Sequence, residues 1–177
     1  MVLEMLLFAH LGITLALGRF IAARYALAVN LLFLGLGSML PDIIDKPLGL
    51  LLYGTPNMGR IYCHTLLFLL IMAALAAYSR DLRLISLTGG VLVHLVLDFM
   101  WNSPVILFWP LLGPFPAAVQ LDAMSYLQRL LLGLRNPAVL VPECLGLAEV
   151  VYLALTMQPS VFVRMKMALR SIADSRR

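Results

Sequence analysis

Five stretches of mostly apolar residues run through this 177-residue chain, and they constrain its fold more than any other feature. A helix needs roughly 20 mostly apolar residues to cross a bilayer, with about 17 at the lower end of the range. We therefore expect an all-α fold, a polytopic membrane helix bundle of about five transmembrane helices. The predicted spans are residues 2–18, 25–40, 61–78, 84–101 and 138–157.

The composition excludes the common soluble classes. Hydrophobic residues make up 62% of the chain and charged residues only 12%, against about 45–50% and about 25% in soluble domains. A soluble domain of this size has too little interior to bury so much apolar surface. An ordinary soluble enzyme, a disordered protein and a nucleic-acid-binding module are therefore excluded.

Glycine and proline set the expected ends of three spans. Gly18 and Arg19 are expected to end the first span. Pro41 is expected to end the second, because proline disfavours helical conformation in the residue before it. The fifth span is expected to lie between Pro137 and Pro159.

The connection between the fourth and fifth spans, residues 102–137, is apolar but rich in proline. We expect it to contain a re-entrant or interfacial segment at 105–112 and an amphipathic helix at 122–133. In terms of domains, residues 1–163 are predicted to form a single transmembrane helical domain. Residues 164–177 are predicted to form a basic cytoplasmic tail.

Lysine and arginine residues predict the orientation of the spans, because cytoplasmic loops carry an excess of them. Nine of the 13 fall on one side of the predicted topology and four on the other. The N-terminus is therefore expected outside and the C-terminus inside, in a bacterial or archaeal cytoplasmic membrane. The nine are Arg19, Arg24, Arg80, Arg83, Arg164, Lys166, Arg170, Arg176 and Arg177.

Ionisable residues inside these spans indicate a functional site, because each costs about 2.5–3.5 kcal/mol on insertion scales. With a rise of about 1.5 Å per residue, several of them lie about 5–12 Å below the outer surface in the predicted orientation. We therefore expect a polar cluster toward the outer face. The residues concerned are His10, Asp42, His64, His94, Asp98 and Glu143.

His94 and Asp98 stand four residues apart, so a helix presents both on one face. That spacing suits two ligands of one metal ion or one ligand on each of two ions. A hydrogen bond within the helix is the alternative. For His10 the alternative is a hydrogen bond to a backbone carbonyl.

The remaining acids have structural alternatives. Glu143 and Glu149 can take part in hydrogen bonds between helices or be protonated. Asp45 follows the second span and is expected to form a loop ion pair with Lys46 rather than to bind a metal.

Four motifs resemble those of the YdjM-like predicted membrane-bound metal-dependent hydrolases of bacteria and archaea. The departures are an acid at Asp45 where the family has Pro-Asp-x-Asp, Ile61 in place of Gly, and Cys63 in place of Thr. The order of the residues is also similar to that of zinc-dependent phospholipases C. The motifs are His10 before Gly18, Gly37-Ser-Met-Leu-Pro-Asp42, Arg60-Ile-Tyr-Cys-His64-Thr65, and His94 to Asp98 with a later Trp109-Pro110.

The resemblance implies a hydrolase whose metal ligands are His10, Asp42, His64, His94 and Asp98. One or two divalent ions, zinc or alternatively manganese, would activate water for cleavage of a phosphoester or another ester. Arg60 is expected to hold a phosphate oxygen, with lipid-headgroup contact as the alternative. Glu143 is expected to act as a general base or as a hydrogen-bond acceptor for a ligating histidine.

Two other functions are compatible with the sequence. The same groups can serve a metal-ion or proton transporter or channel, although no inverted repeat is visible. A non-catalytic membrane scaffold is the third possibility. The expected partners are the lipid bilayer, an amphiphilic or phospholipid-like substrate and a second copy of the chain, and no nucleic acid.

Overall fold

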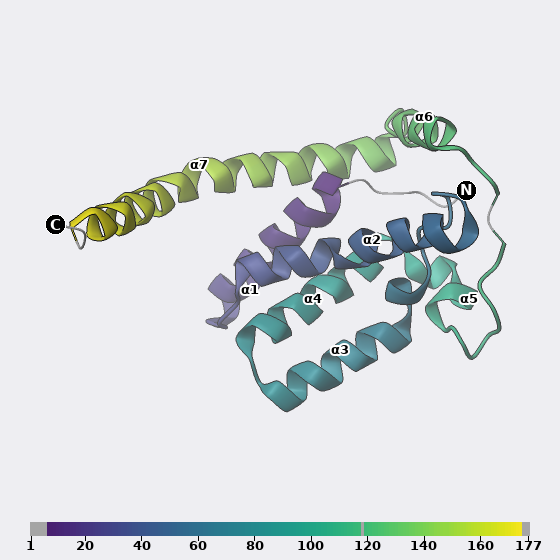
Figure 1. Ribbon diagram of the computed structural model, residues 1–177, viewed down its shortest axis with the longest axis horizontal. Coiled ribbons are helices and arrows are strands. Elements are labelled where there is room, and N and C mark those ends of the chain that lie inside the picture. The colour runs from purple at the N-terminus through teal and green to yellow at the C-terminus, as the bar shows by residue number, and fades with distance from the viewer. Residues whose placement is uncertain (1–6, 118, 175–177) are drawn as a thin grey trace.

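A computed structural model describes residues 7–117 and 119–174 of the chain (Figure 1). These residues form helices and connecting turns, and no strand occurs among them, so the predicted all-α class is confirmed for this part of the chain. The helical elements, in chain order, are η1 (Ala9–Ile13), α1 (Thr14–Tyr25), α2 (Leu31–Tyr53), η2 (Tyr62–His64), α3 (Leu66–Ser79), α4 (Leu82–Leu97), η3 (Met100–Asn102), α5 (Pro104–Leu107), α6 (Ala123–Gly133) and α7 (Pro137–Asp174).

One segment among the described residues, Pro137–Thr156 of α7, is long and apolar enough to cross a membrane. The apolar helices α3 and α4 have 14 and 16 residues, which corresponds to about 21 and 24 Å of helix. The hydrocarbon core of a bilayer is about 30 Å thick. The structure therefore supports a helical protein with one candidate span, and the five-span arrangement stays a prediction.

The α2 helix continues through Pro41, which corrects the predicted end of the second span. Asn30 caps the start of α2 by accepting a hydrogen bond from the Phe33 N–H at 3.2 Å, and the helix runs to Tyr53. A proline inside a helix costs about 3 kcal/mol, and here the packing of α2 against α4 offsets that cost. Asp42 and Asp45 consequently lie within one helix, about one turn apart.

The α1 helix also continues past its predicted end at Gly18 and Arg19. A Cβ atom on Gly18 would lie 2.2 Å from Leu34 Cδ2. This glycine therefore allows close contact between α1 and α2 instead of ending the helix. Residues 2–6 of the predicted first span lie outside the described residues.

The α7 helix runs without a break from Pro137 to Asp174 and therefore passes Pro159, where the fifth span was expected to end. Its first part includes the segment that is apolar enough to cross a membrane. The predicted tail is helical as far as Asp174, and residues 175–177 lie outside the described residues.

Two glycines bring α2 and α4 into contact and thereby position the polar centre. A Cβ atom on Gly37 would lie 2.0 Å from the Leu87 carbonyl oxygen, and one on Gly90 would lie 2.2 Å from the Leu34 carbonyl oxygen. The two backbones can approach each other this closely only because glycine has no side chain. In Figure 1 these two helices lie side by side. His94, one turn after Gly90, therefore faces the backbone of α2.

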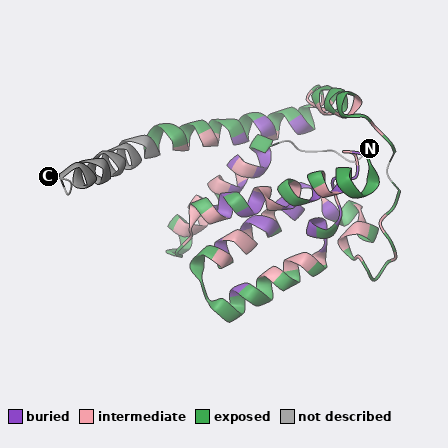
Figure 2. Cartoon of the chain, in the orientation of Figure 1, coloured by how far each residue is buried: buried purple, intermediate pink, exposed green. Residues whose placement is uncertain are grey.

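The π-helical turn η1 packs against α7 through a second pair of glycines. A Cβ atom on Gly12 would lie 2.0 Å from the Gly146 carbonyl oxygen, and one on Gly146 would lie 2.0 Å from the Phe8 carbonyl oxygen. Figure 2 shows buried residues where α7 meets this turn and exposed residues along much of its remaining described surface. The contact places Glu143 beside the start of the turn that carries His10.

The connection to α7 contains the predicted amphipathic helix. This helix, α6, begins after Asp122, which caps it by accepting a hydrogen bond from the Ser125 N–H at 2.8 Å. At 105–112, where an interfacial segment was predicted, the structure has part of the four-residue helix α5 followed by turns. The re-entrant or interfacial placement of this segment stays a prediction.

Candidate metal centre

The five residues predicted to bind metal converge on one buried position, and we call them the metal centre. His10 comes from η1, Asp42 from α2 and His64 from η2, while His94 and Asp98 come from α4 and its C-terminal cap. Between zero and 3% of the surface of each histidine and of Asp98 is exposed. Residues more than 80 positions apart in the sequence therefore share one polar interior site.

Two overlapping groups of three residues have ligand atoms spaced for a metal ion. In the first, the His64 Nε2 atom lies 3.6 Å from Asp42 Oδ1 and 3.1 Å from His94 Nε2. In the second, His10 Nε2 lies 3.2 Å from Asp98 Oδ1, and His94 Nε2 lies 3.9 Å from Asp98 Oδ2. His94 belongs to both groups, so it lies at the centre of the cluster.

The orientation of His94 leaves one particular nitrogen for a ligand. Its Nδ1 atom lies 2.7 Å from the Ser38 carbonyl oxygen, which can only accept a hydrogen bond, so we assign the proton to Nδ1. In the neutral ring Nε2 then carries a lone pair. This lone pair is directed at the other side chains of the metal centre and not at the Ser38 carbonyl.

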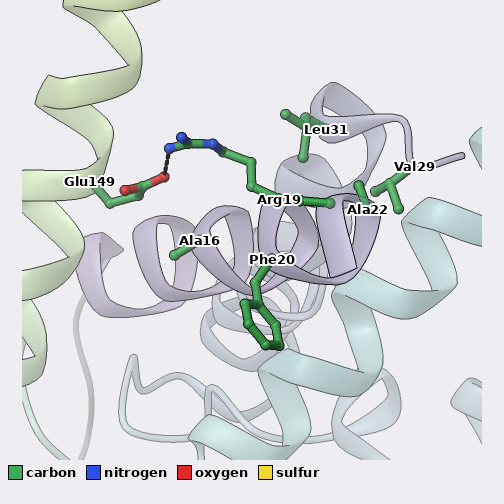
Figure 3. A pocket seen from close by; sticks show the side chains of 8 residues that line it. Ala16, Arg19, Phe20, Ala22, Val29, Leu31 and Glu149 are labelled. Carbon is green, nitrogen blue, oxygen red and sulfur yellow. Dashed lines mark hydrogen bonds and ion pairs between the residues drawn. The ribbon is translucent and has the colours of Figure 1, made fainter. Parts of the chain in front are cut away.

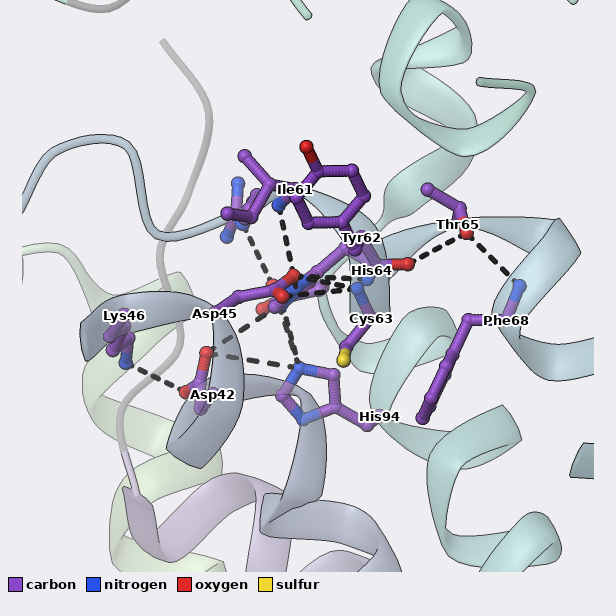
Figure 4. A network of polar contacts seen from close by, with 12 residues as sticks. Asp42, Asp45, Lys46, Ile61, Tyr62, Cys63, His64, Thr65, Phe68 and His94 are labelled. Carbon is purple, nitrogen blue, oxygen red and sulfur yellow. Dashed lines mark hydrogen bonds and ion pairs between the residues drawn. The ribbon is translucent and has the colours of Figure 1, made fainter. Parts of the chain in front are cut away.

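His64 is held in the same tautomer. Its Nδ1 atom donates to Asp45 Oδ2 at 2.7 Å, and its Nε2 atom faces His94 Nε2 at 3.1 Å (Figure 4). Two nitrogens bound to one tetrahedral zinc ion at about 2.0–2.1 Å stand about 3.3 Å apart. The spacing and the lone pairs of the two histidines therefore fit ligation of one ion between them.

Asp98 links the metal centre to Arg60. The Asp98 Oδ2 atom accepts a hydrogen bond from Arg60 Nε at 2.8 Å and lies 3.5 Å from His64 Nε2. Only 17% of the Arg60 side chain is exposed. The structure therefore directs Arg60 inward to the metal centre, in place of the lipid-headgroup contact that was its alternative.

Asp42 has the cationic partner that was predicted for Asp45. Lys46 Nζ donates to Asp42 Oδ2 at 2.7 Å, across one turn of α2, and leaves Asp42 Oδ1 directed at His64 (Figure 4). The predicted loop ion pair between Asp45 and Lys46 is therefore wrong. The reason is that α2 continues beyond Pro41, which puts Lys46 four residues after Asp42 on one helix face.

Asp45 is completely buried and hydrogen-bonds to the turn that carries His64. Sequence reasoning missed this role. The available signal was a second acid shortly after Pro41-Asp42, displaced by one position from the family pattern. The Ser38 carbonyl was missed as well, because a backbone group carries no signal in the sequence.

Glu143 lies near the metal centre but its hydrogen bonds go to the backbone. Its two carboxylate oxygens accept from the Phe8 N–H at 3.0 Å and the Ala9 N–H at 3.2 Å. Glu143 thus fixes the start of the turn that carries His10. These contacts give no support to its predicted role as a general base.

Glu149 lies apart from the metal centre and forms an ion pair with Arg19. This contact joins α7 to α1 and agrees with the hydrogen bonding between helices that was predicted as the structural alternative for Glu149. Figure 3 shows this ion pair among the residues that line a pocket, which α1, the start of α2 with the residues before it, and Glu149 of α7 form. The volume of the pocket is about 600 Å³. The Arg19 guanidinium also lies over the Tyr152 ring, 4.8 Å from its centroid. Glu149 is therefore accounted for without a metal.

Comparison with known proteins identifies the family. A family model described as YdjM inner membrane protein matches residues 5–168 of the chain, a range that contains every residue of the metal centre. No match was found among curated proteins or among solved structures. The chain therefore belongs to the YdjM inner membrane protein family.

Proposed function

We propose that this protein is a membrane-embedded, metal-dependent hydrolase that cleaves a phosphoester or another ester in a lipid-like substrate. The observation that carries the proposal is the pair of buried histidines whose Nε2 atoms lie 3.1 Å apart. Both Nδ1 atoms are engaged elsewhere. At this distance one Nε2 atom can donate a proton to the other, and a cation placed between the two nitrogens can bind both in place of that proton.

We assign the main metal position to Asp42, His64 and His94, with Asp98 as the next available ligand. The Nε2 atom of His94 has a single lone pair and can therefore bind only one ion, although it belongs to both groups of three. A second ion would depend on His10 and Asp98 Oδ1. Nitrogen and oxygen ligands in this proportion suit zinc, with manganese as the alternative.

A divalent ion held at this position supplies Lewis-acid activation of water and of the scissile ester. The chain itself supplies orientation. Arg60 uses Nε to hold Asp98, and its Nη atoms, which make no hydrogen bond to a described residue, are available to a phosphate oxygen. Asp98 is thereby kept in position to bind metal while Arg60 binds substrate.

An aromatic cluster beside the metal centre supports an amphiphilic substrate. The Tyr62 ring packs edge-on against those of Trp109 and Phe115, with ring centroids 5.2 Å apart in both pairs. Tyr62 stands two residues before His64, so an apolar wall adjoins the turn that carries a metal ligand. We infer that the substrate reaches the site from the bilayer.

We propose the membrane arrangement that the sequence predicted. About five helices cross the cytoplasmic membrane, the N-terminus lies outside, the C-terminus lies inside and the metal centre faces outward. The excess of Lys and Arg on the predicted cytoplasmic side supports this arrangement. Cysteine labelling of Ala26 and Met124 variants from outside intact cells tests it, because the two positions are predicted to lie on opposite sides.

Elemental analysis of the detergent-purified protein tests the proposed metal site. We expect zinc in the unaltered protein and little zinc in the variant that combines His94→Ala with Asp98→Ala. An E149Q variant, altered in an ion pair outside the metal centre, should retain the metal. Equal metal contents in the double variant and the unaltered protein would remove the site as proposed.

Hydrolysis of a panel of lipid-like phosphoesters tests the activity. We expect zinc-dependent cleavage that the double variant lacks and that R60K reduces about 100-fold, because lysine cannot hold Asp98 and a phosphate with one planar group. R60K should still bind zinc, because Asp42, His64 and His94, to which we assign the main metal position, are unaltered. Metal transport through liposomes without any hydrolysis would contradict the proposal and favour a transporter.

A further inference from the structure

Asp45 carries a buried negative charge that the proposed function leaves unexplained. None of its surface is exposed. Among the described residues, no lysine or arginine pairs with it, because the neighbouring Lys46 bonds to Asp42. Burial of an ionised carboxylate is costly unless hydrogen bonds compensate it, so the contacts of Asp45 indicate what its charge is for.

Four N–H groups converge on the Asp45 carboxylate. Three are backbone donors, from Ile61 at 2.9 Å, Cys63 at 3.0 Å and His64 at 3.2 Å, and all three reach Oδ2. The fourth is the His64 Nδ1–H, at 2.7 Å from the same oxygen. Oδ1 accepts a further bond from the Cys63 N–H at 3.1 Å. The carboxylate thus binds both the turn and the ring that the turn carries (Figure 4).

We propose that Asp45 is a positioning residue that determines which nitrogen of His64 faces the metal. By accepting from Nδ1–H it keeps the lone pair on Nε2, the atom directed at His94. By accepting from three backbone N–H groups it fixes the turn, so that the ring cannot swing away. The inference rests on the metal centre of the proposed function.

The geometry argues against Asp45 as a ligand. Its oxygens lie at the Nδ1 edge of the His64 ring, whereas His94, Asp42 and Asp98 face the Nε2 edge. The imidazole therefore separates Asp45 from the metal position. A carboxylate in that place makes the ligating nitrogen a stronger base, and loss of such a partner typically weakens metal binding 10- to 100-fold.

The variant D45N tests this role with little change in volume. The asparagine oxygen can take the place of Oδ2, but the side chain then carries no charge, and its NH₂ group, which cannot accept a hydrogen bond, faces the Cys63 N–H that Oδ1 accepts from. D122N is the matched control. Asp122 caps α6 at an exposed position, and asparagine caps helices as well as aspartate does.

We expect D45N to bind zinc 10- to 100-fold more weakly than the unaltered protein, measured by competition with a chelator. The visible absorption bands of bound cobalt should shift, because the His64 nitrogen is oriented differently. D122N should match the unaltered protein in both measurements. Unchanged zinc affinity and cobalt bands in D45N would overturn the inference.

A second comparison separates positioning from a general contribution to folding. In an H64A background the D45N substitution should cause no further loss of zinc affinity, because Asp45 acts through the missing ring. The same fold-loss in both backgrounds would overturn the inference. If D45N does not fold, the D45E variant tests the same inference. It keeps the negative charge but displaces the carboxylate from His64, so we expect weakened zinc binding. Unaltered zinc binding in D45E would overturn the inference.

The outcome is distinguishable from that of the proposed function. A protein that binds zinc, shows the expected D45N effects and hydrolyses no ester would support the positioning role while removing the hydrolase activity. A protein that binds no zinc in any form would overturn both.

Discussion

The metal centre and the Arg19–Glu149 pair both place ionisable side chains among apolar helices, but their charges are balanced differently. The Arg19 and Glu149 side chains are 36% and 19% exposed and neutralise each other. In and around the metal centre, Asp98 has Arg60 and Asp42 has Lys46. Asp45 adds a third carboxylate, which no lysine or arginine among the described residues pairs with and which contacts the His64 ring instead.

This difference shows what each place can bind. An ion pair of one cation and one anion at a partly exposed position needs no further ion to neutralise it, and it contributes little to stability. The metal centre instead brings the Nε2 atoms of His10, His64 and His94 together with oxygens of Asp42 and Asp98, a set of atoms that could hold a metal ion. Burial alone therefore does not identify a candidate binding site, and the convergence of such atoms does.

The largest effect that separates the two places is stabilisation by zinc. A ligand present at 1,000 times its Kd and bound only by the folded protein adds about 4 kcal/mol to the free energy of unfolding. We expect that gain for the unaltered protein and for E149Q, and a much smaller gain for H64A, which keeps Asp42, His94 and Asp98, by denaturant unfolding in detergent monitored by circular dichroism. An equal gain in H64A would show that zinc binds elsewhere.

An intermediate effect is expected from the glycines that bring α2 to the metal centre. G90A introduces a Cβ atom 2.2 Å from the Leu34 carbonyl oxygen and 2.7 Å from the Ser38 nitrogen, and such overpacking costs about 1–3 kcal/mol. It should also weaken zinc binding, because Ser38 orients His94.

The neighbouring glycine provides a matched control for that substitution. A Cβ atom on Gly89 would meet only Leu34 Cδ1, at 3.5 Å, which is an ordinary contact. G89A should therefore leave the free energy of unfolding and the zinc affinity unchanged or slightly improved. Equal behaviour of G89A and G90A would mean that the close approach of α2 and α4 does not hold the site together.

The smallest effect is expected at the Arg19–Glu149 pair. E149Q keeps the shape of the side chain and removes its charge, and the midpoint of unfolding should change little, because exposed ion pairs contribute little. Zinc affinity and the cobalt spectrum should remain as in the unaltered protein. A large loss of zinc in this variant would show that the two places are coupled through α7 and would break the distinction drawn above.

Local sequence signals predicted the helix α6 but not the ends of three other helices. The amphipathic pattern after Asp122 predicted α6, because capping and periodicity act within one or two turns. The ends at Gly18, Pro41 and Pro159 were wrong. At Gly18 and Pro41, contacts with another helix outweigh the local preference, and such contacts leave no signal near the residue concerned.

The candidate site was also only partly predictable. His10, Asp42, His64, His94 and Asp98 were identified because polar residues are costly in apolar spans and because their order resembles a family pattern. Asp45 was misjudged, since its partners lie in the turn at 61–64. The catalytic role of Glu143 stays a prediction, and its observed partners are the backbone N–H groups of residues 8 and 9. Backbone N–H groups are present at every position, so no pattern distinguishes those that a distant carboxylate will bind.

The sequence by itself determined that the chain is apolar and helical and that its few histidines and acids are costly to bury apart from one another. Only the tertiary structure decided that Asp42 faces the Nε2 atom of His64, whereas Asp45, three residues later, accepts a hydrogen bond from the Nδ1 atom of the same ring. The physical reason is that these roles depend on the relative placement of α2, α4 and the turn before α3. Backbone contact at Gly37 and Gly90 sets the placement of α2 and α4, and the buried Asp45 carboxylate ties the turn to α2.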